Sequence, residues 1–148
     1  MPRGRLEVLL VGAKGLENTD FLSNMDPYAV VICRTQEQKS SVASGKGTTP
    51  EWNETFVFTL SDGVSEIRIK VMDSDNFSED DFVGEATIPL EPLFDEGNIP
   101  PTVYNVVKAE EFRGEIKVGL TFTPERGSEL EFKAEEGNYG GWKESAMD

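Results

Sequence analysis

The feature that most restricts the fold of this chain is a series of short segments in which apolar and polar residues alternate. Alternation with a period of two is typical of β-strands that bury one face. Turn-forming residues separate the segments, and none carries the sustained 3.6-residue repeat of a long helix. About eight such strands at hairpin-length spacing predict an all-β fold, an eight-stranded antiparallel β-sandwich.

The predicted strands fill most of the first 124 residues, with one helical turn at residues 92–97. Turn signals lie between them, at Gly45-Lys46-Gly47, Ser61-Asp62-Gly63 and Pro100-Pro101. The predicted strands are residues 6–13, 27–34, 39–44, 54–60, 66–72, 82–89, 102–107 and 114–123.

One predicted loop, between the strands 66–72 and 82–89, is strongly acidic and contains no base. At about 4 Å and an effective dielectric of about 20, each like-charge pair costs on the order of 4 kcal/mol. The acids therefore either point apart into water or surround a cation, and the loop alone does not decide between these. An EF-hand is excluded, because Ser78 would stand where that motif needs glycine. The acids are Asp73, Asp75, Glu79, Asp80 and Asp81.

A second base-free acidic loop, residues 19–28, precedes the second predicted strand and carries Asp20 and Asp26. Pro27 disfavours the helical region for Asp26 and holds it extended. An Asp-Pro pair by itself is typical of an ordinary turn. Loops cluster at the two ends of a sandwich, however, so the two acidic loops can meet and share a calcium ion, which takes six to eight oxygen ligands.

Composition excludes several classes of function. The chain has 148 residues, enough for one domain with its own core. The net charge of −14 argues against binding DNA or anionic membrane through the overall field. The absence of histidine excludes Ser-His-Asp triads and most transition-metal sites. Cys33 lies in an apolar segment, which predicts a buried, reduced thiol. Without an apolar signal core or a membrane-length apolar run, we expect a cytoplasmic protein.

Five short motifs together resemble the C2 domain, a calcium-dependent membrane-binding β-sandwich. The resemblance covers residues 4–124 and implies the type II circular arrangement. It makes residues 1–124 a C2 domain and leaves residues 125–148, with seven acids and three bases, as an acidic and flexible extension. The whole chain is similar to small single-domain plant proteins of the elicitor-responsive and phloem-protein kind, which suggests plant defence signalling. The motifs are Asp20, Asp26-Pro27-Tyr28, Trp52-Asn53-Glu54-Thr55-Phe56, Asp73-Ser74-Asp75 and Asp81-Phe82-Val83-Gly84.

The resemblance implies a calcium site built from both acidic loops. The loops carry seven acids, so two calcium ions would reduce their formal charge from −7 to −3. Five carboxylates serve two ions only by bridging, and calcium is favoured over magnesium because its coordination geometry is more flexible. The implied ligands are the side chains of Asp20, Asp26, Asp73, Asp75, Asp81 and Ser78, with backbone carbonyls near Thr19, Ser74 and Glu79.

Apolar residues on the same loops predict membrane contact once calcium has neutralised the acids. These tip residues are Phe21, Leu22 and Met25 on the first loop and Phe77 on the second. For Phe77, burial in the core is the alternative. Phe82, by contrast, is expected to lie in the core. A modest basic patch is also predicted on a sheet face. In the family such a patch binds phosphoinositides, and a contribution to solubility is the alternative. Its residues are Arg34, Lys39, Lys46, Arg68 and Lys70.

These features predict calcium-dependent binding to anionic phospholipid, by a monomeric recruitment or signalling module that moves from the cytoplasm to the plasma membrane. The alternative is a protein or RNA interaction or transport protein with a structural calcium site; Tyr139 and Trp142 in the tail would suit a protein partner. DNA is not an expected partner, and RNA is one only in this alternative. An enzyme is not expected, because neither a nucleophile nor a separate base accompanies the aspartates.

Overall fold

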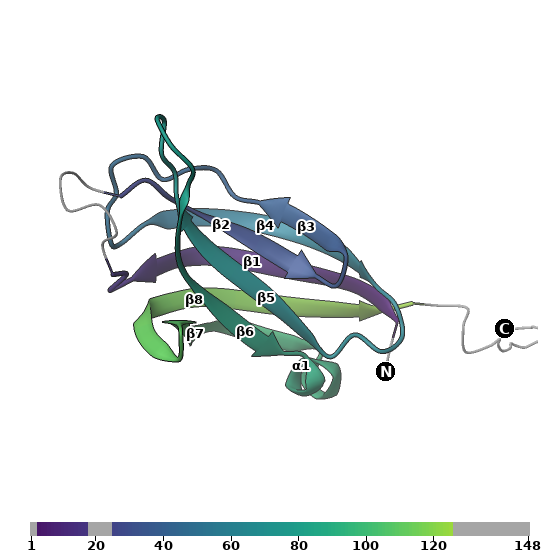
Figure 1. The fold of residues 1–148 in the computed structure, drawn as a ribbon. Coiled ribbons are helices and arrows are strands. Elements are labelled where there is room, and N and C mark those ends of the chain that lie inside the picture. Colours follow the sequence, from purple (N-terminus) through teal and green to yellow (C-terminus); the bar gives the residue numbers. More distant parts are fainter. Residues whose placement is uncertain (1–2, 18–24, 126–148) are drawn as a thin grey trace, which may run out of the picture.

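The computed structural model describes residues 3–17 and 25–125, which form eight strands and one short helix (Figure 1). Every paired strand runs antiparallel to its neighbour. In chain order the elements are β1 (Gly4–Lys14), β2 (Pro27–Cys33), β3 (Gln36–Lys39), β4 (Glu51–Leu60), β5 (Glu66–Asp73), β6 (Asp81–Pro89), α1 (Glu91–Glu96), β7 (Asn98–Lys108) and β8 (Glu111–Pro124).

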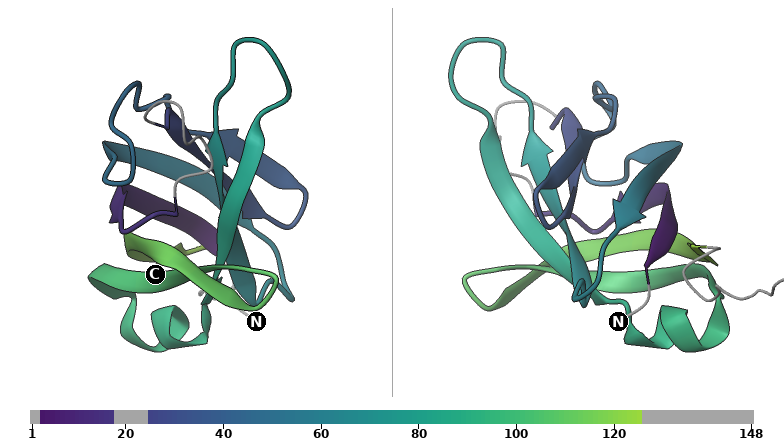
Figure 2. Two further views of the ribbon diagram at one scale, coloured as in Figure 1. Left: turned by 60° about the vertical axis from the view of Figure 1, so that its left-hand side comes forward. Right: turned by 90° about the vertical axis from the view of Figure 1, so that its right-hand side faces the viewer.

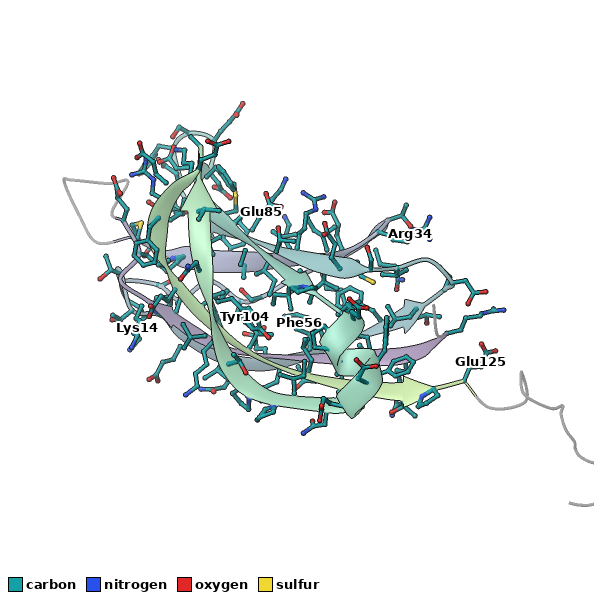
Figure 3. All side chains as sticks on the ribbon, turned by 90° about the horizontal axis from the view of Figure 1, so that it is seen from below. Lys14, Arg34, Phe56, Glu85, Tyr104 and Glu125 are labelled. Carbon is teal, nitrogen blue, oxygen red and sulfur yellow. The ribbon has the colours of Figure 1, made fainter. Side chains whose placement is uncertain are left out.

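The strands form two packed layers that meet along one side. The strand order is β3-β2-β5-β6-β7-β8-β1-β4. Glu85 with Val107 is the pairing that joins β6 to β7, so the order divides there into two four-stranded layers (Figure 2). The core lies between them, and Phe56 points into it (Figure 3). The prediction of an eight-stranded antiparallel sandwich is confirmed.

Side chains close the opposite side of the sandwich, where β3 and β4 are the edge strands. The Gln36 side-chain amide donates to the Thr59 carbonyl at 2.7 Å and accepts from the Thr59 N–H at 3.3 Å. The Gln38 amide donates to the Val57 carbonyl at 2.7 Å. Edge strands leave backbone groups unpaired and invite association with other chains, so these two glutamines give β4 partners that a further strand would otherwise supply.

Strand β2 is buried on both faces. Ala29, Val31 and Cys33 face the main core, as predicted for Cys33, and burial raises the pKa of that thiol. The alternate residues form a second apolar cluster on the outer face of β2 and β5. That cluster consists of Tyr28, Val30 and Ile32, with Met72 packed against them.

Several element boundaries differ from the sequence expectation. The third strand is Gln36–Lys39 and not 39–44, because a tight turn at Arg34 (φ 56°) returns the chain directly against β2. The fourth strand begins at Glu51 and not at residue 54, so Trp52 is buried within β4. The Pro100-Pro101 pair, predicted as a turn, lies inside β7.

The pairing of β7 with β8 shifts in register between Ile99 and Thr102. Proline lacks an N–H and is tolerated at such irregularities, which explains the prolines inside β7. The predicted helical turn is confirmed as α1, which ends at Gly97 in the left-handed conformation (φ 81°). Within the described ranges, no helix is long and apolar enough to cross a bilayer.

Candidate functional site

The two acidic segments predicted to meet are in direct contact at one end of the sandwich. The Asp26 N–H donates to Asp73 Oδ1 at 2.9 Å, and the Ser74 N–H donates to the Asp26 carbonyl at 3.0 Å. Pro27, which begins β2, is the sheet partner of Asp73, which ends β5. The β5–β6 loop, residues 74–80, projects from this end, which we call the loop end (Figure 1).

Three of the five predicted aspartate ligands belong to this junction. Asp81 begins β6 and is the cross-strand partner of Asp73. Asp73 is only 4% exposed, whereas Asp81 is open to solvent. Asp26 Oδ1 also accepts the N–H of Gly45 at 2.6 Å, which ties the β3–β4 connection to the same place. The sheet register therefore places the backbones of Asp26 and Asp81 on either side of Asp73.

Asp75 is turned toward its own loop. Its two carboxylate oxygens accept the N–H of Phe77 at 2.9 Å and the hydroxyl of Ser78 at 2.8 Å. These hydrogen bonds hold the pKa of Asp75 below its usual value, and the bond from the Phe77 N–H contributes most. Asp75 and Ser78 thus bond to each other. Among residues 3–17 and 25–125, no three acidic side chains gather closely enough to hold a metal ion.

The remaining predicted ligands are in mixed positions. Ser74 uses its N–H on Asp26, and the Glu79 carbonyl accepts a 3.5 Å hydrogen bond from the Ser78 hydroxyl. Thr19 and Asp20, with the predicted tip residues Phe21 and Leu22, lie outside the described residues. The ligand roles of all these residues stay predictions.

A brace that the sequence did not reveal holds the β5–β6 loop against β2. The Tyr28 hydroxyl donates to Asp80 Oδ2 at 2.5 Å, and the Asp75 N–H donates to Asp80 Oδ1 at 3.0 Å. Burial, reinforced by the hydrogen bond and charge of Asp80, raises the pKa of Tyr28 to about 12. The same hydroxyl contributes most to lowering the pKa of Asp80. The two residues are 52 positions apart, so local spacing gave no signal of this contact.

The predicted tip residues that the structure describes behave differently from each other. Phe77 is 97% exposed at the loop end, so its alternative placement in the core is wrong, while its contact with membrane stays a prediction. Met25 as an exposed tip residue is wrong. Its side chain is 0% exposed within the main core, and the Gly47 N–H donates to its carbonyl at 3.0 Å. Met25 directly precedes Asp26, whose bonds to Asp73 and Gly45 draw this segment inward.

The predicted basic patch is only partly one surface. Lys39 and Lys70 flank Val30 on neighbouring strands. Arg68, beside Ile32, forms an ion pair with Glu85 at 2.9 Å, and Arg34 lines a shallow hollow together with Arg68. Lys46 as part of this patch is wrong, because it lies on the β3–β4 connection between Gly45, which bonds Asp26, and Gly47, which bonds Met25.

Residues 4–106 match the sequence profile of the C2 domain. This match spans more than half of the chain, and the strand arrangement and the acidic loop end agree with it. The chain belongs to the C2 domain family.

Within that family, the chain is similar over nearly its whole length to small plant proteins. It is 67% identical to Elicitor-responsive protein 3 of Oryza sativa subsp. japonica over 146 residues, which is 99% of this chain and 100% of that protein. It is 62% identical to 16 kDa phloem protein 2 of Arabidopsis thaliana, covering 98% of this chain and 97% of the relative. A solved C2 domain-containing protein from a putative elicitor-responsive gene superposes with a TM-score of 0.74 at 67% identity, covering 83% of this chain and 90% of that one. None of these names states an enzymatic activity.

Proposed function

We propose that this protein binds anionic phospholipid membrane in a calcium-dependent manner through its loop end, and acts as a recruitment or signalling module without enzymatic activity. Such a module would reside in the cytoplasm and move to the plasma membrane when calcium rises. The names of its elicitor-responsive relatives support a role in plant defence signalling. Calcium binding is common in the C2 domain family, to which the chain belongs.

The observation that carries this proposal is the contact between Asp26 and Asp73. Asp26 and Asp73 are 47 positions apart in the sequence, yet the Asp26 N–H donates a hydrogen bond to the Asp73 carboxylate. Asp81 is the partner of Asp73 on the neighbouring strand β6. Asp73 is buried there, and buried carboxylates are retained when they are hydrogen-bonded or hold a cation. Carboxylate and carbonyl oxygens on loops are the donor set that calcium prefers. On this proposal, Asp26, Asp73 and Asp81 would supply part of a calcium site.

The remaining ligands would come from Asp75, with Asp20 of the β1–β2 connection. Asp75 must exchange its bonds to Phe77 and Ser78 for the cation, which predicts that calcium changes the environment of the 77 and 78 amides. Bound calcium would neutralise the loop end and offer coordination positions to lipid phosphate. Phe77, already exposed, would then be free to enter the bilayer interface.

Sedimentation of the full chain with phosphatidylserine-containing vesicles tests this proposal, in calcium and in excess chelator. We expect pelleting with calcium only. Asp26→Asn and Asp73→Asn should each abolish the calcium response, because the amide keeps the hydrogen-bonding oxygen and removes the charge. Asp62→Asn is the matched control, because Asp62 is an exposed acid in the β4–β5 connection.

Two results would contradict the proposal. Pelleting that is equal with calcium and with chelator, or absent in both, would favour the second candidate, a protein or RNA interaction protein with a structural calcium site. The similarity to 16 kDa phloem protein 2 is the observation that keeps this candidate in view. Unfolding of Asp26→Asn or Asp73→Asn without metal would show instead that these residues maintain the scaffold.

A further inference from the structure

The β7–β8 hairpin has a tight turn at its tip. Its two turn residues, Ala109 and Glu110, both have positive φ angles, 52° and 67°. Two consecutive residues of this kind form the type I′ turn, whose twist matches that of the flanking strands. Lys108 pairs with Glu111 beside the turn, and Val107 pairs with Phe112 one step further back.

Val107 and Phe112 form an exposed apolar pair on this hairpin. Phe112 is 57% exposed and Val107 is 41% exposed. Residues directly opposite each other on antiparallel strands place their side chains on the same face. The pair is therefore a small apolar surface at a convex tip. The proposed calcium site does not use it.

Direct contacts attach this hairpin to the chain just before the first acidic loop. The Glu17 N–H donates to the Arg113 carbonyl at 3.0 Å, and the Arg113 guanidinium forms an ion pair with the Glu17 carboxylate. Gly114 lies so close to Leu16 that an added Cβ would come within 2.9 Å of the Leu16 Cα. Phe112 directly precedes Arg113, which is bonded to Glu17. Glu17 in turn lies three positions before Asp20 in the sequence.

Other contacts attach the hairpin to the end of the second acidic loop. The Lys108 ammonium donates to the Phe82 carbonyl at 3.3 Å and lies 5.9 Å from the centre of the Phe82 ring. Phe82, expected in the core, is only partly buried. Phe82 directly follows Asp81. The hairpin is therefore fastened to the bases of both acidic loops, and Figure 2 shows it projecting beside β6.

We propose that the tip of the β7–β8 hairpin is an additional membrane-contacting element, in which Val107 and Phe112 enter the interface of the bilayer bound by the loop end. This inference rests on the function proposed above. A lipid surface fits the patch because the hairpin is joined to the proposed membrane-binding end. Lys108 and Arg113 also offset most of the charge of Glu17, Glu110 and Glu111, and Arg113 pairs directly with Glu17 and Glu111. A protein interface needs about 800 Å² per partner. Two side chains on a convex tip do not provide that area, since even a large aromatic residue buries only about 150–250 Å².

Two truncations with a matched control test the inference. Phe112→Ala should weaken calcium-dependent vesicle binding by roughly four- to twenty-fold, the effect of losing the exposed half of a phenylalanine from an apolar contact. Val107→Ala should weaken binding less. Val57→Ala should leave binding unchanged, because Val57 is similarly exposed (47%) but pairs with Glu7 in the middle of β1. Circular dichroism and thermal melts establish that each variant is folded.

A direct readout of insertion does not depend on affinity. Phe112→Cys and, separately, Val57→Cys can carry an environment-sensitive dye, since the native Cys33 is buried and its raised thiol pKa protects it from labelling. The dye at position 112 should shift to the blue with calcium and anionic vesicles together, and the dye at position 57 should not.

The outcomes separate the two proposals. If wild-type protein binds with calcium and Phe112→Ala binds as tightly as Val57→Ala without a dye shift, the hairpin inference is wrong and the proposed function stands. If the wild type does not bind, both fall. If Phe112→Ala instead converts a dimer to a monomer in sedimentation velocity, the patch covers a second copy of the chain and the membrane assignment is overturned.

Discussion

Substitution of Met25 distinguishes a core residue from a membrane tip with one measurement of stability. The side chain is completely buried in the main core, so Met25→Ala removes buried atoms and leaves a cavity. Such substitutions cost about 2–5 kcal/mol. Met25 precedes β2 and lies outside the strands, where relaxation of its neighbours can fill part of a cavity more easily than between paired strands, so we expect a value near the lower end, about 2–3 kcal/mol. For a domain of this size, that corresponds to a fall in Tm of about 5–10 °C.

Thermal and urea unfolding of wild type and Met25→Ala, without calcium, measure this effect. Met72→Ala is the control, because Met72 lies on the outer face and is only partly buried. It should cost clearly less. The contrary result is a Met25→Ala protein whose Tm stays within about 2 °C of wild type, less than the shift from 1 kcal/mol, and whose vesicle affinity falls. That combination would return Met25 to the membrane tip and refute the burial described here.

Three further predictions follow from single positions. Glu110→Gly should stabilise the protein by about 1 kcal/mol in thermal melts, since glycine adopts a positive φ without the penalty that other residues pay; an unchanged or lower Tm would show that the turn is not strained. Gly84→Ala should cost about 1–3 kcal/mol, because its Cβ would lie 2.6 Å from Val106 Cγ1, and a variant as stable as wild type would contradict this packing. In an ultraviolet titration, Tyr28 should ionise near pH 12. Asp80→Asn should lower the pKa of Tyr28 but leave it above the ordinary tyrosine value, because burial is the largest cause of the shift. The raised pKa means that the stability from Tyr28 is present below its ordinary pKa of about 10 and lost as pH rises toward the folded value; if Asp80→Asn leaves the titration unchanged, the brace is absent in solution.

The sequence predicts most of the fold because alternation directly reports which face of a strand is buried. Strands β1, β5 and β6 emerge where the pattern indicates, and the acidic segments meet as the clustering of sandwich loops suggests. Boundaries fail where the signal is weak: the polar edge strand β3 has no apolar face, and Pro100-Pro101 indicate a turn unless the irregular pairing with β8 is known. The acidic residues around Met25 indicate an exposed loop, whereas its burial depends on contacts with distant residues. The partnership of Tyr28 with Asp80 depends on the register of three strands, which no local pattern encodes.

The glutamine contacts along β3 make the sandwich sensitive to chemical ageing. Deamidation of Gln36 or Gln38 would replace an amide donor with a carboxylate that only accepts, facing the carbonyl oxygens of Thr59 and Val57. Two acceptors repel, so the seam would part and β4 would present an unprotected ladder to other molecules. The closure of this side of the sandwich therefore depends on two neutral side chains of β3 keeping their amide groups.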